Sequence, residues 1–205
     1  MQNLNVLPVS TTVGDIDDLM AVFSNPPYIV AEGLLVAYYG ALSSVTGYSI
    51  AVGIYPERGY DSLTNDDNIT VNIYRKSTKN QFQKKGTVIL PGAHGEVDHI
   101  IVSNPTAVYN AKEKKFMVYY LATAESTVTT ICLATGSVFN QLNKYGTVSG
   151  IATPVISAPG ATTITAAELK VIYNKEENLY KVYYQVTSGA TRSMYVSTSV
   201  NGYNF

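Results

Sequence analysis

A repeat within the chain restricts the possible folds more than any other feature of the sequence. Residues 108–120 (VYNAKEKKFMVYY) align without a gap to residues 172–184 (IYNKEENLYKVYY), an offset of 64 positions. Each copy has two apolar segments separated by a polar turn that begins with Asn, and each copy ends in a Tyr-Tyr pair. Short apolar segments bounded by turn residues are typical of β-hairpins. The repeat therefore predicts two similar hairpins.

Further segments extend the repeat into three units. A segment rich in β-branched residues follows each hairpin, at 130–135 and 193–198, and predicts a third strand. Residues 24–39 follow the same plan with a turn two residues shorter, and both 24–26 and 103–105 read Ser-Asn-Pro. In this first unit we expect residues 43–67 to intrude between the second and third strands.

Three such units predict an all-β, propeller-like fold with three recognisable blades. Units of about 50–65 residues, each a meander of three or four strands, are typical of propeller blades. The predicted organisation is an N-terminal extension (1–23) and a propeller-like domain (24–205), with blades at about 24–92, 97–150 and 160–205. Residues 15–23 have near-helical apolar spacing and predict one short helix. The alternative fold is a β-sandwich whose hairpins are alike in composition only.

Three blades do not fill a ring, because propellers usually have about four to eight. Two explanations stay open. Either the sequence stops short of the native protein, as one part of a five-bladed propeller, or the arrangement is open or completed by oligomerisation.

Charge and composition exclude several classes of protein. Lys and Arg number 14 against 15 Asp and Glu, so no basic surface for nucleic acid is expected. Hydrophobic residues make up 46% and charged residues 14%, a composition that favours a folded chain. Cys132 is the only cysteine, which excludes an internal disulfide. We expect no signal peptide and no membrane insertion, because the N-terminus lacks a basic, then apolar, leader and the apolar runs are short.

The blade pattern resembles the five-bladed propeller glycosidases of the invertase, levansucrase, arabinanase and xylosidase group. The similar segments are Ser-Asn-Pro at 24–26 and 103–105, Leu-Ala-Thr at 133–135, and Ser-Thr-Ser at 197–199 leading to residues 201–205. The resemblance implies three acidic residues, two Asp and one Glu, at the openings of three successive blades and directed into a central cavity. The repeat register places Asn25, Asn104 and Glu168 there, so only Glu168 is acidic.

That difference argues against hydrolysis. Glycoside hydrolysis needs a carboxylic acid and a second carboxylate, and general-base assistance is commonly worth about 10²–10⁴-fold. An amide still exchanges hydrogen bonds with sugar hydroxyls. The sequence thus predicts a non-catalytic glycan-binding or structural module. The alternative is a glycoside hydrolase in which Glu168 is the general acid and a carboxylate such as Asp98 replaces the missing partner. A third possibility is that Asn25 and Asn104, each before Pro, only shape turns.

Other candidate residues lie in loops. His94 and His99, with Glu96 and Asp98 between them, suggest either a solvated connection or an imidazole near the channel mouth, and His99 is the stronger ligand-binding candidate. Tyr60, in the predicted intrusion, is a candidate for ligand contact. The Tyr-Tyr pairs are interpreted as inter-blade packing, one ring toward each neighbouring blade.

The predicted partner is a carbohydrate, an oligo- or polysaccharide, and we expect no cofactor and no metal. A composition with few charges and many Thr, Ser, Asn and Tyr suits a phage virion or tail-fibre component, which would assemble with other virion proteins or as a homo-oligomer. Localisation stays open between virion and cytoplasm.

Overall fold

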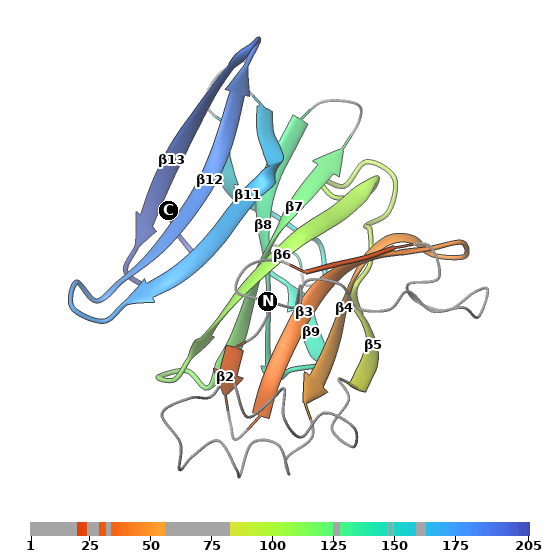
Figure 1. Cartoon of the computed structure of the whole chain (residues 1–205), viewed down its shortest axis with the longest axis vertical. Coiled ribbons are helices and arrows are strands. Elements are labelled where there is room, and N and C mark those ends of the chain that lie inside the picture. The colour runs from red at the N-terminus through yellow and green to blue at the C-terminus, as the bar shows by residue number, and fades with distance from the viewer. Residues whose placement is uncertain are drawn as a thin grey trace, which may run out of the picture.

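The computed structural model of the protein describes residues 20–23, 29–31, 34–55, 83–124, 128–146, 148, 150–158 and 163–205. Within these ranges thirteen strands form three antiparallel sheets, and there is no helix. The three sheets lie next to one another in chain order (Figure 1). The all-β prediction is therefore confirmed.

The first sheet contains β1 to β5. Their bounds are β1 (Met20–Phe23), β2 (Ile29–Ala31), β3 (Leu34–Ser43), β4 (Gly47–Tyr55) and β5 (Gln83–Ile89). The strand order is β1-β3-β4-β5, and β2 also pairs with β3. Because β4 occupies one edge of β3, β1 and β2 share the other edge and together make the first strand of this sheet.

Two predictions for this region are wrong. The short helix predicted at 15–23 is a strand where it is described, because Met20–Phe23 pairs with β3 from Leu42 to Tyr39. The predicted intrusion at 43–67 is also wrong, because β4 follows β3 after a turn at 44–46 and pairs along its whole length. The third strand of the unit thus precedes the long segment between β4 and β5, residues 56–82, which lies outside the described residues.

The second and third sheets come next in the chain. The second contains β6 (Ile101–Asn110), β7 (Lys115–Ala124), β8 (Val128–Val138), β9 (Gln141–Lys144) and β10 (Pro154–Ser157). The third contains β11 (Thr163–Asn174), β12 (Leu179–Ser188) and β13 (Thr191–Ser199). In the second sheet the order is β10-β8-β7-β6, and β9 pairs with the other end of β8.

The strand registers confirm the 64-residue repeat. Tyr109 lies opposite Phe116 in the β6–β7 hairpin, and Tyr173 lies opposite Tyr180 in the β11–β12 hairpin. Both turns use the same chemistry. The Oδ1 atom of Asn110 accepts the backbone N–H groups of the residues two and three positions on, both at 3.1 Å, and Asn174 does the same at 3.0 and 3.3 Å. Asparagine is common in such turns because its side chain reproduces a backbone acceptor.

Two apolar cores hold the three sheets together, and the second sheet contributes to both. Side chains of β7 alternate between them, as strand geometry requires. The core between the first and second sheets includes Tyr38, Val52, Val118 and Tyr120. The core between the second and third sheets includes Met117, Tyr119, Val182 and Tyr184. The adjacent rings of Tyr119 and Tyr120 thus face opposite neighbouring sheets, which is the packing expected for the Tyr-Tyr pairs.

The described residues include no helix that is long and apolar enough to cross a bilayer.

Candidate functional site

The first strands of the three sheets lie next to one another. On one side β6 contacts β1 and β2 of the first sheet, and on the other side it contacts β11 of the third sheet. A buried hydrogen bond joins two of these strands directly, because the Val171 N–H of β11 donates to Thr106 Oγ1 of β6 over 3.2 Å. The candidate residues at the beginning of each unit are therefore on neighbouring strands.

Both fully described first strands are interrupted by a bulge. The β6–β7 register shifts between Ser103 and Thr106, so that Asn104 and Pro105 stand opposite one residue, Tyr120. The β11–β12 register shifts between Thr165 and Leu169, so that residues 166–168 have no counterpart on β12. Bulges re-aim side chains and are frequent beside active sites. The repeat register places Asn104 and Glu168 in these two bulges.

The backbone conformation at position 104 explains in part why an asparagine is found in this bulge. Its φ angle is 48°, in the left-handed region that non-glycine residues seldom adopt. Asparagine tolerates this conformation better than most side chains do. The residue is half-buried, and Pro105 beside it is buried. Asn104 is thus suited to a structural role in the bulge, whatever its amide binds.

The other candidate residues of this group are only partly placed. Glu168 is located by its backbone, in the bulge of β11. Asn25 lies between β1 and β2 in the chain, outside the described residues, and Tyr60 is also outside them. Their positions in a site remain predictions.

Asp98 does not face an open cleft. Its side chain is fully buried, and Lys144 Nζ lies 2.7 Å from its Oδ2 atom. The Tyr120 hydroxyl donates to the same oxygen over 3.1 Å. Burial and the nearby Cys132 and Asp98 groups raise the pKa of Tyr120 well above its usual range. The carboxylate that was an alternative partner for Glu168 is therefore engaged in a buried ion pair between the first and second sheets.

Sequence reasoning missed this cluster, because Asp98, Tyr120 and Lys144 come from a loop and two different strands with no local pattern. The sequence contains one weak indication of this cluster, the glycine at position 92. A methyl group at this position would lie 2.5 Å from Asp98 Oδ1 and 2.1 Å from Glu96 Oε2, so the two carboxylates approach the glycine backbone closely. The Gly92 N–H also donates to the Asp98 carbonyl oxygen over 3.2 Å.

An open hollow of about 340 Å³ lies beside the Asp98 cluster. It is formed mainly by the end of β5, by the loop at 90–96 and by β9, not by the bulged first strands. Its lining combines apolar and polar side chains, including Leu90, Pro91, Leu142, Glu96, Asn143 and Lys144.

His99 belongs to the loop that precedes β6. Its Nδ1 atom lies 2.8 Å from the Glu96 carbonyl oxygen, which only accepts, so Nδ1 bears the proton of this hydrogen bond. The rings of His94 and His99 are 5.2 Å apart. Within the described ranges, no group of three or more His, Cys, Asp or Glu side chains is arranged to hold a metal ion.

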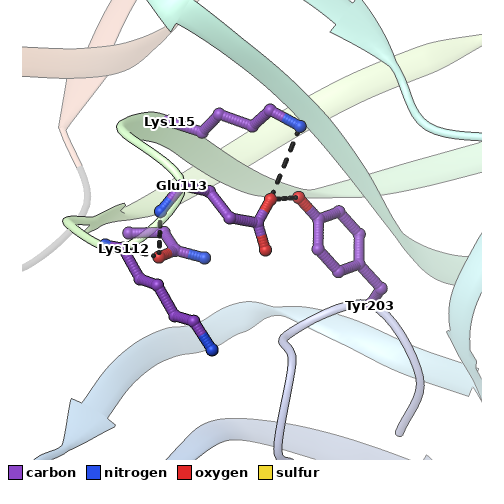
Figure 2. Close-up of polar contacts among 5 residues, drawn as sticks. Lys112, Glu113, Lys115 and Tyr203 are labelled. Atoms are coloured by element: carbon purple, nitrogen blue, oxygen red, sulfur yellow. Dashed lines mark hydrogen bonds and ion pairs between the residues drawn. The ribbon is translucent and has the colours of Figure 1, made fainter.

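A second polar cluster connects the C-terminal segment to the β6–β7 turn (Figure 2). The Tyr203 hydroxyl donates to Glu113 Oε2 over 2.9 Å, and Lys115 Nζ lies 3.4 Å from the same oxygen. The Tyr203 ring also packs on Tyr145, with 5.0 Å between ring centres. Burial, followed by the hydrogen bond to Glu113, raises the pKa of Tyr203 above its usual range. These contacts attach residues 200–205 to the second sheet.

No protein family model and no curated protein matches the sequence. Solved structures do match. A family 117 glycoside hydrolase from the marine bacterium Zobellia galactanivorans superposes with a TM-score of 0.61 and 11% identity, over 87% of this chain and 52% of that one. Fructan 1-exohydrolase IIa from Cichorium intybus gives 0.60 and 9%, over 98% and 32%. An alpha-L-arabinofuranosidase from Lactobacillus brevis gives 0.58 and 9%, over 91% and 54%.

The fold is that of propeller-type glycoside hydrolases. The three sheets are therefore propeller-like blades, and the prediction of three antiparallel blades is confirmed. The chain spans about half the length of the first and third of these proteins and about a third of the second.

Proposed function

We propose that this chain is a non-catalytic carbohydrate-binding or structural module on a glycosidase-like propeller scaffold, with Asn25, Asn104 and Glu168 as its principal ligand-binding residues. The main support is the bulge of β6, where the amide of Asn104 stands at the position for which the family resemblance implies a carboxylic acid. The solved structures that share the fold support a carbohydrate as the ligand, since they include glycoside hydrolases and an exohydrolase in complex with 1-kestose.

The chemistry of the described residues favours binding over turnover. An amide donates and accepts hydrogen bonds, as sugar hydroxyls do, but it does not transfer a proton at neutral pH. Hydrolysis needs two carboxyl groups that face the glycosidic bond from either side. Asp98, the carboxylate that precedes the Asn104 bulge in the chain, is fully buried and paired with Lys144, so it does not provide the second group.

His99 and Tyr60 are proposed as peripheral ligand contacts. The division into an extension (1–23) and a domain (24–205), and the setting in a phage virion or tail fibre, stay predictions.

A substitution at Asn104 separates the proposed binding role from a turn-forming role. Glycine accepts the positive φ angle of 48° without side-chain strain, so Asn104→Gly keeps the bulge and removes only the amide. We expect wild-type protein to bind members of a glycan array, and Asn104→Gly to bind the same glycans at least about tenfold more weakly, the effect of about 1.4 kcal/mol.

The matched control is Asn140→Gly in the exposed turn after β8, which is expected to leave glycan affinity unchanged. Circular dichroism melts verify that both variants fold. If wild-type protein binds no glycan on the array, the carbohydrate-binding half of the proposal is wrong and the structural role is the one left.

The second candidate function is glycoside hydrolysis with Glu168 as the general acid. It is favoured by the position of Glu168 in the bulge that matches the bulge of Asn104. A reducing-sugar assay on pooled polysaccharides tests it, with Glu168→Gln as the inactivating change and Glu176→Gln, in an exposed turn, as the control. Turnover by the wild type that is lost only in Glu168→Gln would establish this function in place of the non-catalytic one.

A further inference from the structure

Both histidines of the sequence lie in one loop. His94 and His99 are the only two in the chain, and they belong to the described segment that connects β5 to β6. The centres of their rings are 5.2 Å apart, and the ring planes are inclined by 52°, so the rings do not stack. Four residues separate them in the sequence, so the conformation of the loop brings the two imidazoles together.

Backbone hydrogen bonds hold this loop in two successive turns. The Glu96 N–H donates to the Ala93 carbonyl oxygen over 3.0 Å, and the His99 N–H donates to the Glu96 carbonyl oxygen over 3.3 Å. The Gly92 N–H closes the loop by donating to the Asp98 carbonyl oxygen over 3.2 Å. The loop therefore positions both imidazoles before a ligand binds, which lowers the entropic cost of binding.

The side-chain hydrogen bond of His99 leaves its second ring nitrogen available. Because Nδ1 donates to the Glu96 carbonyl oxygen over 2.8 Å, Nε2 bears the lone pair in the neutral ring. Metal-binding histidines almost always donate their other ring N–H in this way, to a carboxylate or a backbone carbonyl, which fixes the orientation of the ring. His99 thus has the hydrogen bond of a metal ligand, and the exposed His94 is accessible from solvent.

The separation of the two rings is compatible with coordination of one ion. A zinc–nitrogen bond of about 2.0–2.1 Å places the ion about 3.2 Å from the centre of each imidazole ring. At a tetrahedral angle, the centres of two such rings are about 5.2 Å apart. The observed distance between the ring centres of His94 and His99 is the same, 5.2 Å.

The chemistry of the two rings selects the class of ion. Imidazole nitrogen suits Zn²⁺, Cu²⁺ and Ni²⁺, whereas Ca²⁺ and Mg²⁺ prefer oxygen ligands. Among the described residues, no third His, Cys, Asp or Glu side chain completes a group with these two. Structural zinc sites have four protein ligands, so a site with two is of the open kind, in which water fills the other positions.

We propose that His94 and His99 form a binding site for one divalent transition-metal ion of the Zn²⁺ and Cu²⁺ class, with one imidazole nitrogen of each residue as a ligand. This replaces the expectation of no metal drawn from the sequence, because only the folded loop brings the two rings together. The proposal does not depend on carbohydrate binding.

Isothermal titration calorimetry with ZnCl₂ tests the site in the full-length chain without a histidine tag. We expect the wild type to bind one ion per chain, and His94→Asn and His99→Asn each to remove one ligand. Loss of an outer-shell partner commonly costs about 10–100-fold in metal affinity, so the loss of a ligand should weaken binding at least about tenfold.

Asparagine is the replacement of choice at position 99. Its side-chain amide nitrogen occupies nearly the same place as Nδ1 of histidine and can donate to the Glu96 carbonyl oxygen, so His99→Asn keeps the hydrogen bond and removes only Nε2. Ile100→Ala is the matched control, because Ile100 is 43% exposed beside His99 and its loss leaves both imidazoles in place. This variant should bind Zn²⁺ as the wild type does. Circular dichroism verifies that all three variants fold.

Electron paramagnetic resonance with Cu²⁺ counts the nitrogen ligands independently. Because the chain has no other histidine, splitting of the signal by imidazole nitrogen reports on these two residues alone. The wild type should show the splitting of two imidazole nitrogens, and each histidine variant that of one. A wild type that binds neither Zn²⁺ nor Cu²⁺ would overturn the proposal. So would an affinity that either His94→Asn or His99→Asn leaves unchanged, because that ring would then not be a ligand.

Discussion

At the scale of single residues, two asparagines determine how the repeated hairpins turn. Asn110 and Asn174 each accept two backbone N–H groups, which fixes the four-residue connection between strands. The two sites differ in burial, because Asn110 is buried and Asn174 is half-buried in a turn whose hydrogen bonds are exposed. Water can therefore replace a lost hydrogen bond more readily at the second site.

We therefore predict that Asn110→Ala lowers the free energy of unfolding by about 1–3 kcal/mol, since it removes a buried side chain together with the two part-buried hydrogen bonds that it accepts. Asn174→Ala, the matched change 64 positions later, should cost roughly 0.5–1 kcal/mol. Urea denaturation at neutral pH measures both values. Equal losses would show that burial does not decide the strength of these turns.

The ion pair of Asp98 and Lys144 is shielded from water, because the first side chain is fully buried and the second is 13% exposed. Lys144→Met should lower the free energy of unfolding by about 3–5 kcal/mol, since it leaves a buried carboxylate without its cation. Asp98→Asn combined with Lys144→Met should be more stable than Lys144→Met alone.

Lys112→Met, at an exposed position in the β6–β7 turn, is the control and should change stability by less than about 0.5 kcal/mol. A loss of similar size in Lys112→Met and Lys144→Met would contradict the assignment of Asp98 and Lys144 as a buried pair. Equilibrium urea curves again provide the measurement.

At the scale of elements, the most accurate predictions from the sequence were those for the repeated hairpins. Two hairpins with the same turn chemistry, 64 residues apart, could be found because each strand pairs with its immediate neighbour in the chain. The prediction of a helix at 15–23 was wrong. Three apolar residues at helical spacing are only weak evidence for a helix, and Met20–Phe23 instead forms a strand that pairs with β3. β4 was missed because Ser49, Ala51 and Gly53 give it weak strand propensity.

The candidate site was predictable to a smaller extent. The register of the repeat was enough to place Asn104 and Glu168 at equivalent points, and both points are bulges. The Asp98 ion pair was not predictable, because tertiary packing alone brings a loop residue, a β7 tyrosine and a β9 lysine together.

The C-terminal segment provides a prediction at this scale. Gly202 has a φ angle of 77°, and a methyl group there would lie 2.8 Å from both Met117 Cε and Tyr119 Oη. The Tyr119 hydroxyl donates to the Gly202 carbonyl over 2.6 Å within the second core. Gly202→Ala should therefore cost about 2–5 kcal/mol, the sum of left-handed strain and overpacking.

Gly189 is a matched control for this effect. Its φ angle is 57°, and a methyl group there would meet no atom within 4 Å. Gly189→Ala should cost only the backbone strain, about 1–2 kcal/mol. Guanidinium denaturation of both variants separates strain from steric overlap. If the two costs are equal, close packing of the C-terminal segment against β7 does not contribute to stability.

At the scale of the whole molecule, the second sheet links the other two. Its strands contribute Val118, Tyr120 and Cys132 to one core, and Met117, Tyr119 and Leu133 to the other. A group that ionises inside this sheet should therefore affect the stability of the entire described fold. The titratable groups buried there are a thiol and two phenols, and all of them have raised pKa values because burial disfavours their charged forms.

The thiol ionises first in the unfolded chain and defines a pH window of its own. Burial raises the pKa of Cys132 from 9.0 to about 12, so between these values the folded protein keeps a proton that the unfolded chain has released. Stability is then lost as the pH rises, by about 1.4 kcal/mol per pH unit for this one group. From pH 7 to 8 the free energy of unfolding should be nearly constant, and from pH 9 to 10 it should fall. The buried tyrosines, whose unfolded pKa is 10.0, begin to contribute as the pH approaches that value, so Cys132 provides only part of the decline between pH 9 and 10.

Cys132→Ala removes the thiol and should make the decline between pH 9 and 10 less steep, although the cavity that it creates lowers stability by a constant amount at every pH. Urea denaturation at half-unit pH intervals measures both curves. Curves that run parallel through this window would contradict the assignment. The decline would then come from groups other than this thiol. A steeper decline in the wild type than in Cys132→Ala would show that one proton in the central sheet is coupled to the unfolding of the whole described fold.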